Sequence, residues 1–206
     1  MQLAEFIEEN EAWSVRGESV LEVGAGTGLA GIVAGLSGGK RVVIGDYPAP
    51  EVLGNIKANA VRNSDARRKD AQEGGIGEAT VEGHERGVLD DTFSKANEGA
   101  FGKILAADCL WLPWQHTNLL NSIEWFLSRE GKAWVVAGFH PGREKMRGFY
   151  KEDALREVSL EVERNAEGSE REWVTDRGIE DVAERKRWLV VAILKKKVGG
   201  SSTKEG

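Results

Sequence analysis

One acidic residue and three glycines stand two positions apart near the start of the chain, at Glu22, Gly24, Gly26 and Gly28. The apolar residues just before and within it suit a short buried strand, and an apolar helical pattern follows over residues 29–36. The order of strand, glycine turn and helix is typical of a nucleotide-binding crossover, because glycine lets a ligand approach the backbone closely. This turn is therefore the first candidate binding site.

The spacing of the glycines narrows the choice of ligand. The dinucleotide fingerprint G-x-G-x-x-G fails, because Leu29 stands where its last glycine is required. A carboxylate at Glu22 would repel a pyrophosphate and hold a cation. S-adenosylmethionine carries an ammonium and a sulfonium group, and it meets this requirement. A nicotinamide-dinucleotide enzyme and an ordinary tight turn remain as alternatives.

A second acid ends the next expected strand, over residues 41–46. Asp46 lies about 20 residues beyond the turn, where an acid commonly accepts hydrogen bonds from a ribose. We expect Asp46 to hold the ribose hydroxyls of the cofactor. The alternative is an unrelated surface carboxylate.

A third acid, Asp108, ends the expected strand over residues 103–108. In an open parallel sheet, ligands bind at the carboxyl ends of the strands. An amine needs a free lone pair to accept a methyl group, and deprotonating a lysine at pH 7 costs about 4.6 kcal/mol. Asp108 is our candidate to orient the amine or accept its proton. The alternative is that it orders the loop or caps a helix.

Aromatic and histidine residues follow the same strands. If the indole rings of Trp111 and Trp114 are exposed, they could form the wall of a site for a cationic substrate. If they are buried, they are packing residues of the core. His140, after the expected strand over residues 133–139, could assist proton removal or cap its loop. Cys109 has no visible base partner, so we expect a small buried residue rather than a nucleophile.

Strands and helices alternate along most of the chain, and two consecutive strands close it. This order predicts an α/β, Rossmann-like, doubly wound and mostly parallel seven-stranded sheet, with an antiparallel C-terminal strand pair and helices on both faces. Residues 64–78 are expected to form a mobile surface loop, residues 87–99 an irregular stretch and residues 166–168 a turn. We expect one domain over residues 1–198 and a flexible tail over residues 199–206.

Composition excludes several classes of protein. The chain has 206 residues and a net charge of −6, which argues against broad nucleic-acid binding. No stretch approaches the length of a membrane span, and the first residues lack the features of a signal peptide. The single cysteine cannot form an internal disulfide, so we expect a reducing compartment, the cytoplasm or alternatively the nucleus. We also expect a monomer and no metal site.

Several motifs together resemble a known family. They cover residues 20–29, 45–48 and 105–111, with more specific ones over residues 138–143 and 184–192. These segments resemble the seven-strand methyltransferases that depend on S-adenosylmethionine. Within that class the chain is most similar to fungal proteins labelled nicotinamide N-methyltransferase-like, a subgroup that overlaps with protein lysine and N-terminal methyltransferases. The resemblance runs from about residue 3 to residue 197.

The resemblance implies a cofactor, a substrate class and a set of site residues. The cofactor is S-adenosylmethionine, and its expected contacts are Glu22, Gly24, Ala25, Gly26, Gly28, Asp46, Tyr47, Arg86 and Ala107. The expected catalytic residues are Asp108 and Trp111, which stands where the family usually has Tyr or Phe. The implied acceptor is a lysine or N-terminal amine of a protein, with a translation factor as one candidate. Alternatives are a small, nicotinamide-like acceptor and a truncated cofactor-binding module with little activity.

Two departures from the family affect these expectations. Relatives usually carry an upstream segment with a tryptophan that lines the cofactor pocket, and Met1 falls just before the first strand region. Relatives also usually have a tryptophan near the adenine where Arg86 stands, although a guanidinium can stack on an aromatic ring. We therefore expect the pocket above Gly24 to be open on one side, with weak cofactor binding and slow turnover.

Overall fold

The computed structural model describes residues 2–68, 79–139, 142–167, 171–172, 174, 178 and 189–197, with the side chains of 64–68, 164–167 and 171–172 left undescribed. The helices are α1 (Gln2–Glu9), α2 (Leu29–Leu36), α3 (Pro50–Arg68), α4 (Thr92–Ala96), α5 (His116–Phe126), α6 (Arg143–Met146) and α7 (Glu152–Glu157). Three short 3-10 helices are η1 (Glu11–Trp13), η2 (Pro113–Gln115) and η3 (Arg147–Tyr150). None of these described helices combines the length and apolar character needed to cross a membrane.

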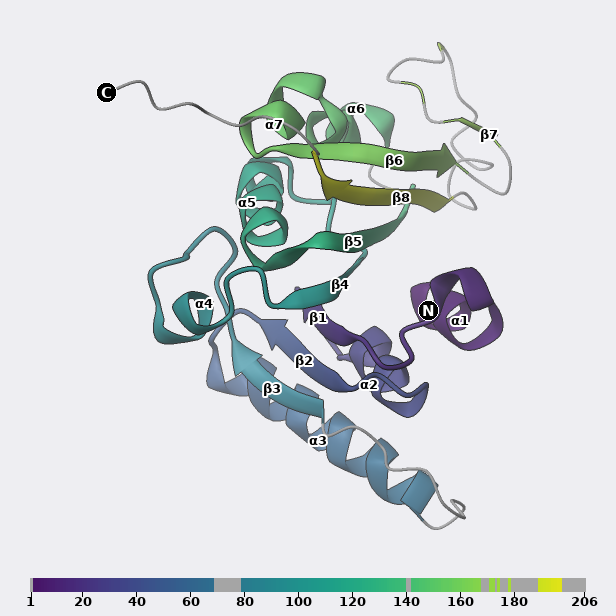
Figure 1. Ribbon diagram of the computed structural model, residues 1–206, viewed down its shortest axis with the longest axis vertical. Helices are drawn as coiled ribbons and strands as arrows, with labels where there is room; N and C mark the ends of the chain where they lie inside the picture. Colours follow the sequence, from purple (N-terminus) through teal and green to yellow (C-terminus); the bar gives the residue numbers. More distant parts are fainter. Residues whose placement is uncertain are drawn as a thin grey trace.

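The strands form one twisted sheet (Figure 1). They are β1 (Ser19–Val23), β2 (Arg41–Asp46), β3 (Ala79–Gly83), β4 (Phe101–Ala107), β5 (Leu127–Gly138), β6 (Leu160–Glu167), β7 (Arg171–Glu172) and β8 (Leu189–Lys196). Their order in the sheet is β3-β2-β1-β4-β5-β8-β6-β7. The first five strands pair in parallel, and β8 runs antiparallel to both β5 and β6. The predicted sheet with its antiparallel C-terminal pair is thus confirmed, and β7 adds two residues at its edge.

The order of the strands places a switch point between β1 and β4. From β1 the chain winds outward to β2 and β3, and it then returns to β4 on the other side. Helices that follow β1 and β4 must therefore leave the sheet in different directions, which opens a crevice at the carboxyl ends of these two strands. Glu22, Asp46 and Asp108 all lie at or near this edge, as expected.

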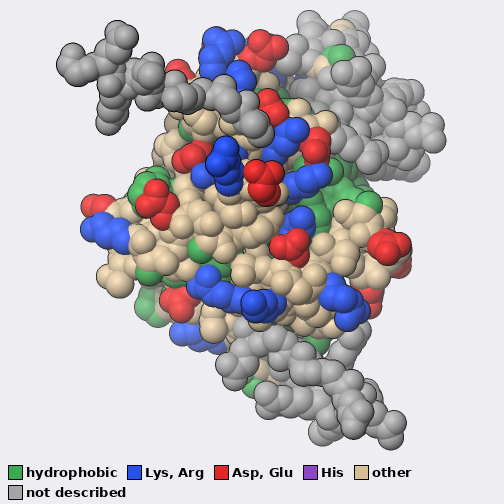
Figure 2. Space-filling model, viewed as in Figure 1, with side chains coloured by type: hydrophobic (Ala, Val, Ile, Leu, Met, Phe, Trp, Pro, Cys, Tyr) green, Lys and Arg blue, Asp and Glu red, His purple; other side chains and the backbone are tan. Residues whose placement is uncertain are grey.

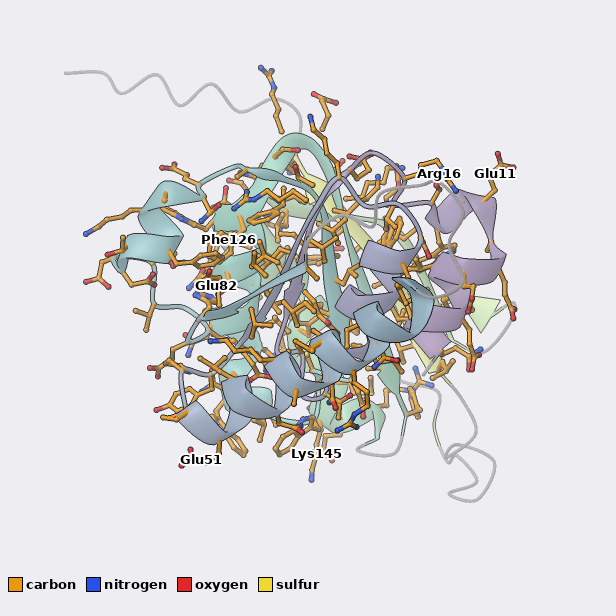
Figure 3. The ribbon with its side chains drawn as sticks, turned by 90° about the horizontal axis from the view of Figure 1, so that it is seen from below. Glu11, Arg16, Glu51, Glu82, Phe126 and Lys145 are labelled. Atoms are coloured by element: carbon orange, nitrogen blue, oxygen red, sulfur yellow. The ribbon has the colours of Figure 1, made fainter. Side chains whose placement is uncertain are left out.

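Alternate residues of the central strands face two separate cores. Leu21 and Ile104 belong to a cluster that includes α5, η3 and α7, whereas Val20 and Leu105 belong to a cluster that includes α1, α2 and α3. Because side chains alternate along a strand, one apolar run serves both faces. In the view of Figure 3, α3 lies along one face of the sheet, with Glu51 near its start.

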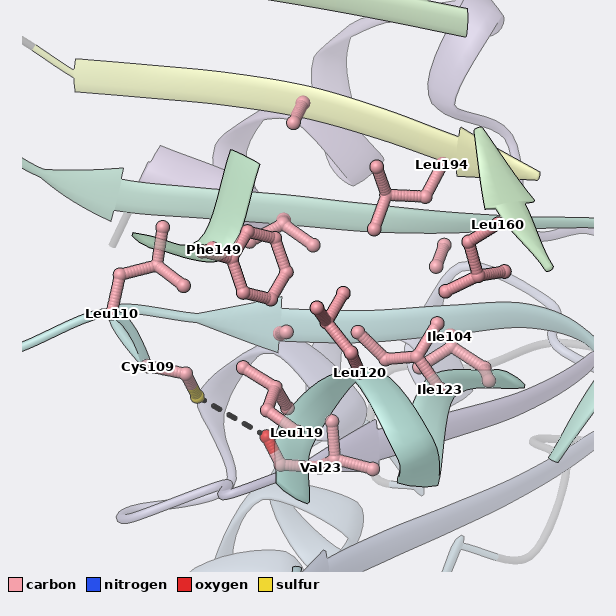
Figure 4. Packing of buried hydrophobic residues seen from close by; sticks show 14 of the residues in the cluster. Val23, Ile104, Cys109, Leu110, Leu119, Leu120, Ile123, Phe149, Leu160 and Leu194 are labelled. Atoms are coloured by element: carbon pink, nitrogen blue, oxygen red, sulfur yellow. Dashed lines mark hydrogen bonds between the residues drawn. The ribbon is translucent and has the colours of Figure 1, made fainter. Parts of the chain in front are cut away.

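The first of these cores is shown in Figure 4, where α5 packs onto β4. Leu120, Ile123 and Ile104 are fully buried there, and Phe149 of η3 belongs to the same buried cluster. Cys109 is buried too, and its Sγ lies 3.4 Å from the carbonyl oxygen of Val23, which accepts its hydrogen bond. This contact joins the segment after β4 to the end of β1.

Charged side chains of both signs are interspersed on the face shown in Figure 2. Several described ion pairs link neighbouring elements, such as Lys132 with Glu163 at 2.7 Å and Lys196 with Glu124 at 3.1 Å. These pairs are only partly buried, and ion pairs near the surface contribute about 0–1 kcal/mol each. The stability of the fold therefore depends mainly on the two cores.

Some local expectations were wrong in detail. The helix α3 continues to Arg68, so the loop expected from residue 64 does not begin there. The helix α4, with Asp91 as its N-cap, interrupts the irregular stretch over residues 87–99. Residues 166 and 167 extend β6 rather than forming a turn. Residues 69–78, His140, most of the motif over 184–192 and the expected tail at 199–206 lie outside the described residues.

A buried tryptophan attaches the N-terminal helix to the sheet and generates a prediction about stability. The ring centroid of Trp13 lies 5.0 Å from that of Phe6 and 4.9 Å from that of Trp134. We expect Trp13→Ala to lower the free energy of unfolding by about 3–5 kcal/mol, as measured by urea denaturation, because it leaves a large cavity. Trp114→Ala is the matched control, since Trp114 is 73% exposed and its loss should cost little. Equal effects of the two substitutions would contradict this prediction.

Candidate functional site

The glycine turn connects β1 to α2 in a conformation that ordinary residues rarely adopt. Gly24 has φ +66° and Gly28, the N-cap of α2, has φ +79°. A Cβ atom on Gly28 would also lie 3.0 Å from Ile56 and 3.3 Å from Ile44. The turn therefore depends on glycine both for its backbone angles and for close packing against β2 and α3.

Asp46, at the end of β2, organises the turn. Its Oδ2 accepts a hydrogen bond of 2.6 Å from the backbone N–H of Gly26, and its Oδ1 accepts one of 2.6 Å from the N–H of Tyr47. Asp46 therefore keeps the turn beside β2 as well as lining the crevice. That Asp46 accepts hydrogen bonds from the ribose hydroxyls of a cofactor stays a prediction.

Glu22 lies beneath the turn, and its side chain is directed at the start of α2. It is only 1% exposed, and its Oε2 accepts a 2.7 Å hydrogen bond from the N–H of Gly31. Burial raises the pKa of Glu22 from 4.5 to about 8. From the sequence we expect a negative charge on Glu22. Without a bound cation, however, the carboxyl group is mostly protonated near pH 7. A bound cation would favour the ionised form.

Two adjoining cavities occupy the crevice. The larger measures about 420 Å³ and is lined by Glu22, the glycine turn, Ala107 and Asp108. The smaller measures about 250 Å³ and is lined by Tyr47, His84, Glu85, Leu112 and Gln115. Four residues line both cavities and mark where they meet: Gly24, Asp46, Arg86 and Trp111. Every cofactor-binding residue expected from the sequence except Gly28 lines one of the two cavities.

Asp108 follows β4 in a left-handed conformation, with φ +54°. Its backbone N–H donates to the carbonyl oxygen of Val136 at 2.7 Å, and its Oδ1 accepts from the N–H of Gly138 at 3.1 Å. Two contacts with β5 thus hold a backbone conformation that is unusual for a residue with a side chain. The same contacts leave the exposed carboxyl group at the wall of the larger cavity.

Trp111 and Trp114 are both exposed, so neither is buried as a packing residue. Trp111 is 55% exposed and forms part of the wall shared by the cavities, so it is available to a ligand. Trp114 is also exposed but lines neither cavity. Cys109 is buried, as expected, and burial raises the pKa of its thiol to about 11.

A buried polar network that the sequence did not predict lies behind Arg86 and is centred on His84. The Nε2 of His84 lies 2.9 Å from the Oγ of Ser122, which also accepts a 2.9 Å hydrogen bond from the N–H of Gly87. On its other side, His84 approaches Ser94 of α4 at 3.4 Å. Burial lowers the pKa of His84, which favours the neutral ring. A signal was present in the sequence, because Ser122 interrupts the apolar stripe of α5.

A second omission is the wall that α1 contributes. Leu3 and Ala4 line the larger cavity beside the glycine turn. The expectation of a pocket open on one side took no account of this helix. Among the residues that the structure describes, no three His, Cys, Asp or Glu side chains are arranged to hold a metal ion.

Comparison with known proteins identifies relatives over most of the chain. A family model described as "Lysine methyltransferase" matches residues 2–152. A protein N-terminal and lysine N-methyltransferase of Schizosaccharomyces pombe is 30% identical over 139 residues, which is 68% of this chain and 52% of the relative. A protein of the same description from Gibberella zeae is 32% identical over 177 residues, covering 80% of this chain and 64% of the relative. The chain thus spans between about half and two thirds of the length of these relatives.

Solved structures share the fold at lower sequence identity. A TehB-like SAM-dependent methyltransferase from Corynebacterium glutamicum matches with a TM-score of 0.63 and 21% identity, over 95% of this chain and 87% of that one. A ribosomal protein L11 methylase from Lactobacillus delbrueckii subsp. bulgaricus matches with a TM-score of 0.58 and 21% identity, over 95% and 78% of the two chains. These matches show that the chain shares its fold with these two proteins.

The raised pKa of Glu22 generates a prediction about stability and pH. The folded pKa of about 8 lies above the ordinary value of 4.5, so the neutral carboxyl favours the folded state at low pH. That contribution is complete below about pH 4.5 and is lost as the pH rises through about 8. We expect the free energy of unfolding of the wild type to fall relative to Glu22→Gln across this range, by at most about 1.4 kcal/mol per pH unit.

Urea denaturation at several pH values measures this difference. Glu51→Gln is the matched control, because Glu51 is exposed on α3 and its replacement should leave the pH profile unchanged. Parallel profiles for the wild type and Glu22→Gln would show that the buried carboxyl does not titrate in this range.

Proposed function

Because the chain belongs to the lysine methyltransferase family, we propose that it is a methyltransferase that uses S-adenosylmethionine to methylate an amine of a protein. The acceptor would be a lysine side chain or an N-terminal amine, as the names of its relatives state. The observation that carries the proposal is the pair of cavities that meet at Asp46. A cofactor with two chemically different halves joined by a ribose requires a site with this layout.

The residues of each cavity fit one half of the cofactor. In the smaller cavity, Tyr47 and Leu112 offer the apolar surface that a planar base requires. In the larger cavity, Glu22 offers a carboxyl group to an ammonium, and Asp46 between the halves can accept hydrogen bonds from ribose hydroxyls. When bound, S-adenosylmethionine supplies a methyl group already activated by its sulfonium.

Asp108 and Trp111 would act on the acceptor amine. Removing the proton from a lysine costs about 4.6 kcal/mol at pH 7, so a carboxylate that attracts or accepts that proton assists the reaction. The exposed ring of Trp111 can hold a cationic side chain while its proton is removed. Both residues line the larger cavity, where the methionine half of the cofactor would bind.

An exposed aromatic rim favours a macromolecular acceptor over a small one. The two tryptophans of the segment after β4 lie outside the cores, and Trp114 is beyond the cavity walls. A large acceptor could cover this surface, whereas a nicotinamide-sized molecule would leave it in water. A translation factor as acceptor, action as a monomer and a location in the cytoplasm or nucleus are further parts of the proposal that depend on family resemblance and composition.

A labelling experiment tests the proposed reaction. The protein is incubated with methyl-labelled S-adenosylmethionine and a fungal cell extract, and the products are separated by size. We expect label in a protein band that is absent when an Asp108→Asn variant is used. Label confined to small molecules would overturn the protein acceptor, and label in neither fraction would overturn the proposed activity.

Loss of the Asp46 carboxylate should weaken cofactor binding. We expect Asp46→Ala to reduce the affinity for S-adenosylmethionine by about 2 kcal/mol in calorimetry, because acceptors for the ribose and for Gly26 are lost together. Asp153→Ala on α7 is the matched control, since its carboxylate forms only an exposed pair with Arg156. An unchanged affinity for Asp46→Ala would contradict the ribose assignment.

Asp108→Asn should separate chemistry from cofactor binding. The amide oxygen of asparagine can still accept the hydrogen bond from Gly138, so the loop should keep its conformation. We expect the methyl-transfer rate to fall about 100-fold or more, with the Kd for S-adenosylmethionine nearly unchanged. Equal losses of binding and rate would indicate that Asp108 only orders the loop.

A further inference from the structure

Arg86 lies at the junction of the two cavities. Its backbone follows β3, and its side chain extends over the glycine turn, where a Cβ atom on Gly24 would collide with its Nη2. The same Nη2 donates a 3.2 Å hydrogen bond to the Sγ of Cys109. The guanidinium is therefore held between the ends of β1 and β4, next to both cavities.

Acidic side chains outnumber cations around Arg86. Among the described residues that line the larger cavity, three are acids and Arg86 is the one cation. No carboxylate of the described residues forms a salt bridge with it, and the thiol of Cys109 is a weak hydrogen-bond acceptor. A guanidinium has five N–H donors in a planar fork that suits a carboxylate. Most of these donors remain available.

The glycine turn itself offers few donors to an anion. The N–H of Ala25 donates to the carbonyl oxygen of Gly45, that of Gly26 to Asp46 and that of Gly28 to Ala25. These bonds stay within the protein. An anionic group in the larger cavity would therefore find its strongest partner in Arg86.

We propose that Arg86 binds the α-carboxylate of the methionine half of S-adenosylmethionine. This inference rests on the proposed function and adds a role to it, because the family resemblance implies only that Arg86 could stack near the adenine. Glu22 and Arg86 both line the larger cavity, and the guanidinium of Arg86 lies next to Gly24. An acid for the ammonium and a guanidinium for the carboxylate together recognise the zwitterionic end of an amino acid.

The buried network behind Arg86 positions it for this role. His84 and Ser122 fix the backbone on both sides of Arg86, since Ser122 contacts the ring of His84 and the N–H of Gly87. The guanidinium thus extends from a fixed base into the junction. Less conformational freedom is lost when a ligand binds to such a side chain.

The test compares two ligands that differ only in the carboxylate. Calorimetry measures the Kd of S-adenosylmethionine and of its decarboxylated analogue for the wild type, Arg86→Gln, Arg86→Lys and Arg86→Trp. Arg129→Gln is the matched control, because Arg129 is exposed on β5 and does not line either cavity. Thermal unfolding of each variant checks that it is folded.

We expect Arg86→Gln to weaken binding of S-adenosylmethionine about 10- to 100-fold, and to change binding of the decarboxylated analogue less than about threefold. Arg86→Lys should recover part of the lost affinity, whereas Arg86→Trp should not. Equal losses for both ligands, or full recovery by Arg86→Trp, would overturn the carboxylate assignment in favour of stacking. A wild type that binds neither ligand would instead overturn the proposed function itself.

Discussion

The hydrogen bond between the Glu22 carboxyl group and the N–H of Gly31 joins the end of β1 to the start of α2, and the candidate site depends on it. The glycine turn passes over this bond, and Asp46 holds the turn from the side of β2. Burial makes the charged form of Glu22 unfavourable unless a cation is near. Stability of the empty turn and affinity for a cationic ligand are thereby linked through one carboxyl group.

The rest of the site is arranged around this turn by the topology of the sheet. The strands β1, β2 and β4 end at the same edge, so acids that are far apart in sequence share one crevice. Segments after β3 and β4 supply Arg86 and Trp111, and α1 supplies a further apolar wall. Polar contacts with neighbouring strands, rather than long helices, position the reactive groups, as the bonds from Asp108 to β5 illustrate.

Sequence patterns predicted the parts of this arrangement that depend on local order. The glycine spacing, the acids at strand ends and the alternating elements sufficed to predict the sheet and to select most residues of the crevice. They did not predict that Glu22 is largely protonated, because its pKa depends on burial by distant elements. They also missed the bonds of His84 with Ser122, which are 38 positions apart and meet only through the packing of α5.

The burial of Cys109 has a consequence for a site that would hold a methylating agent. A thiolate is a strong nucleophile, and one beside a sulfonium would take the methyl group itself. The thiol has a pKa of about 11 and donates toward the carbonyl oxygens of Val23 and Ala107. Burial therefore keeps the thiol in its neutral form at pH 7. The sulfur next to the glycine turn is thus held in a form protected from self-methylation.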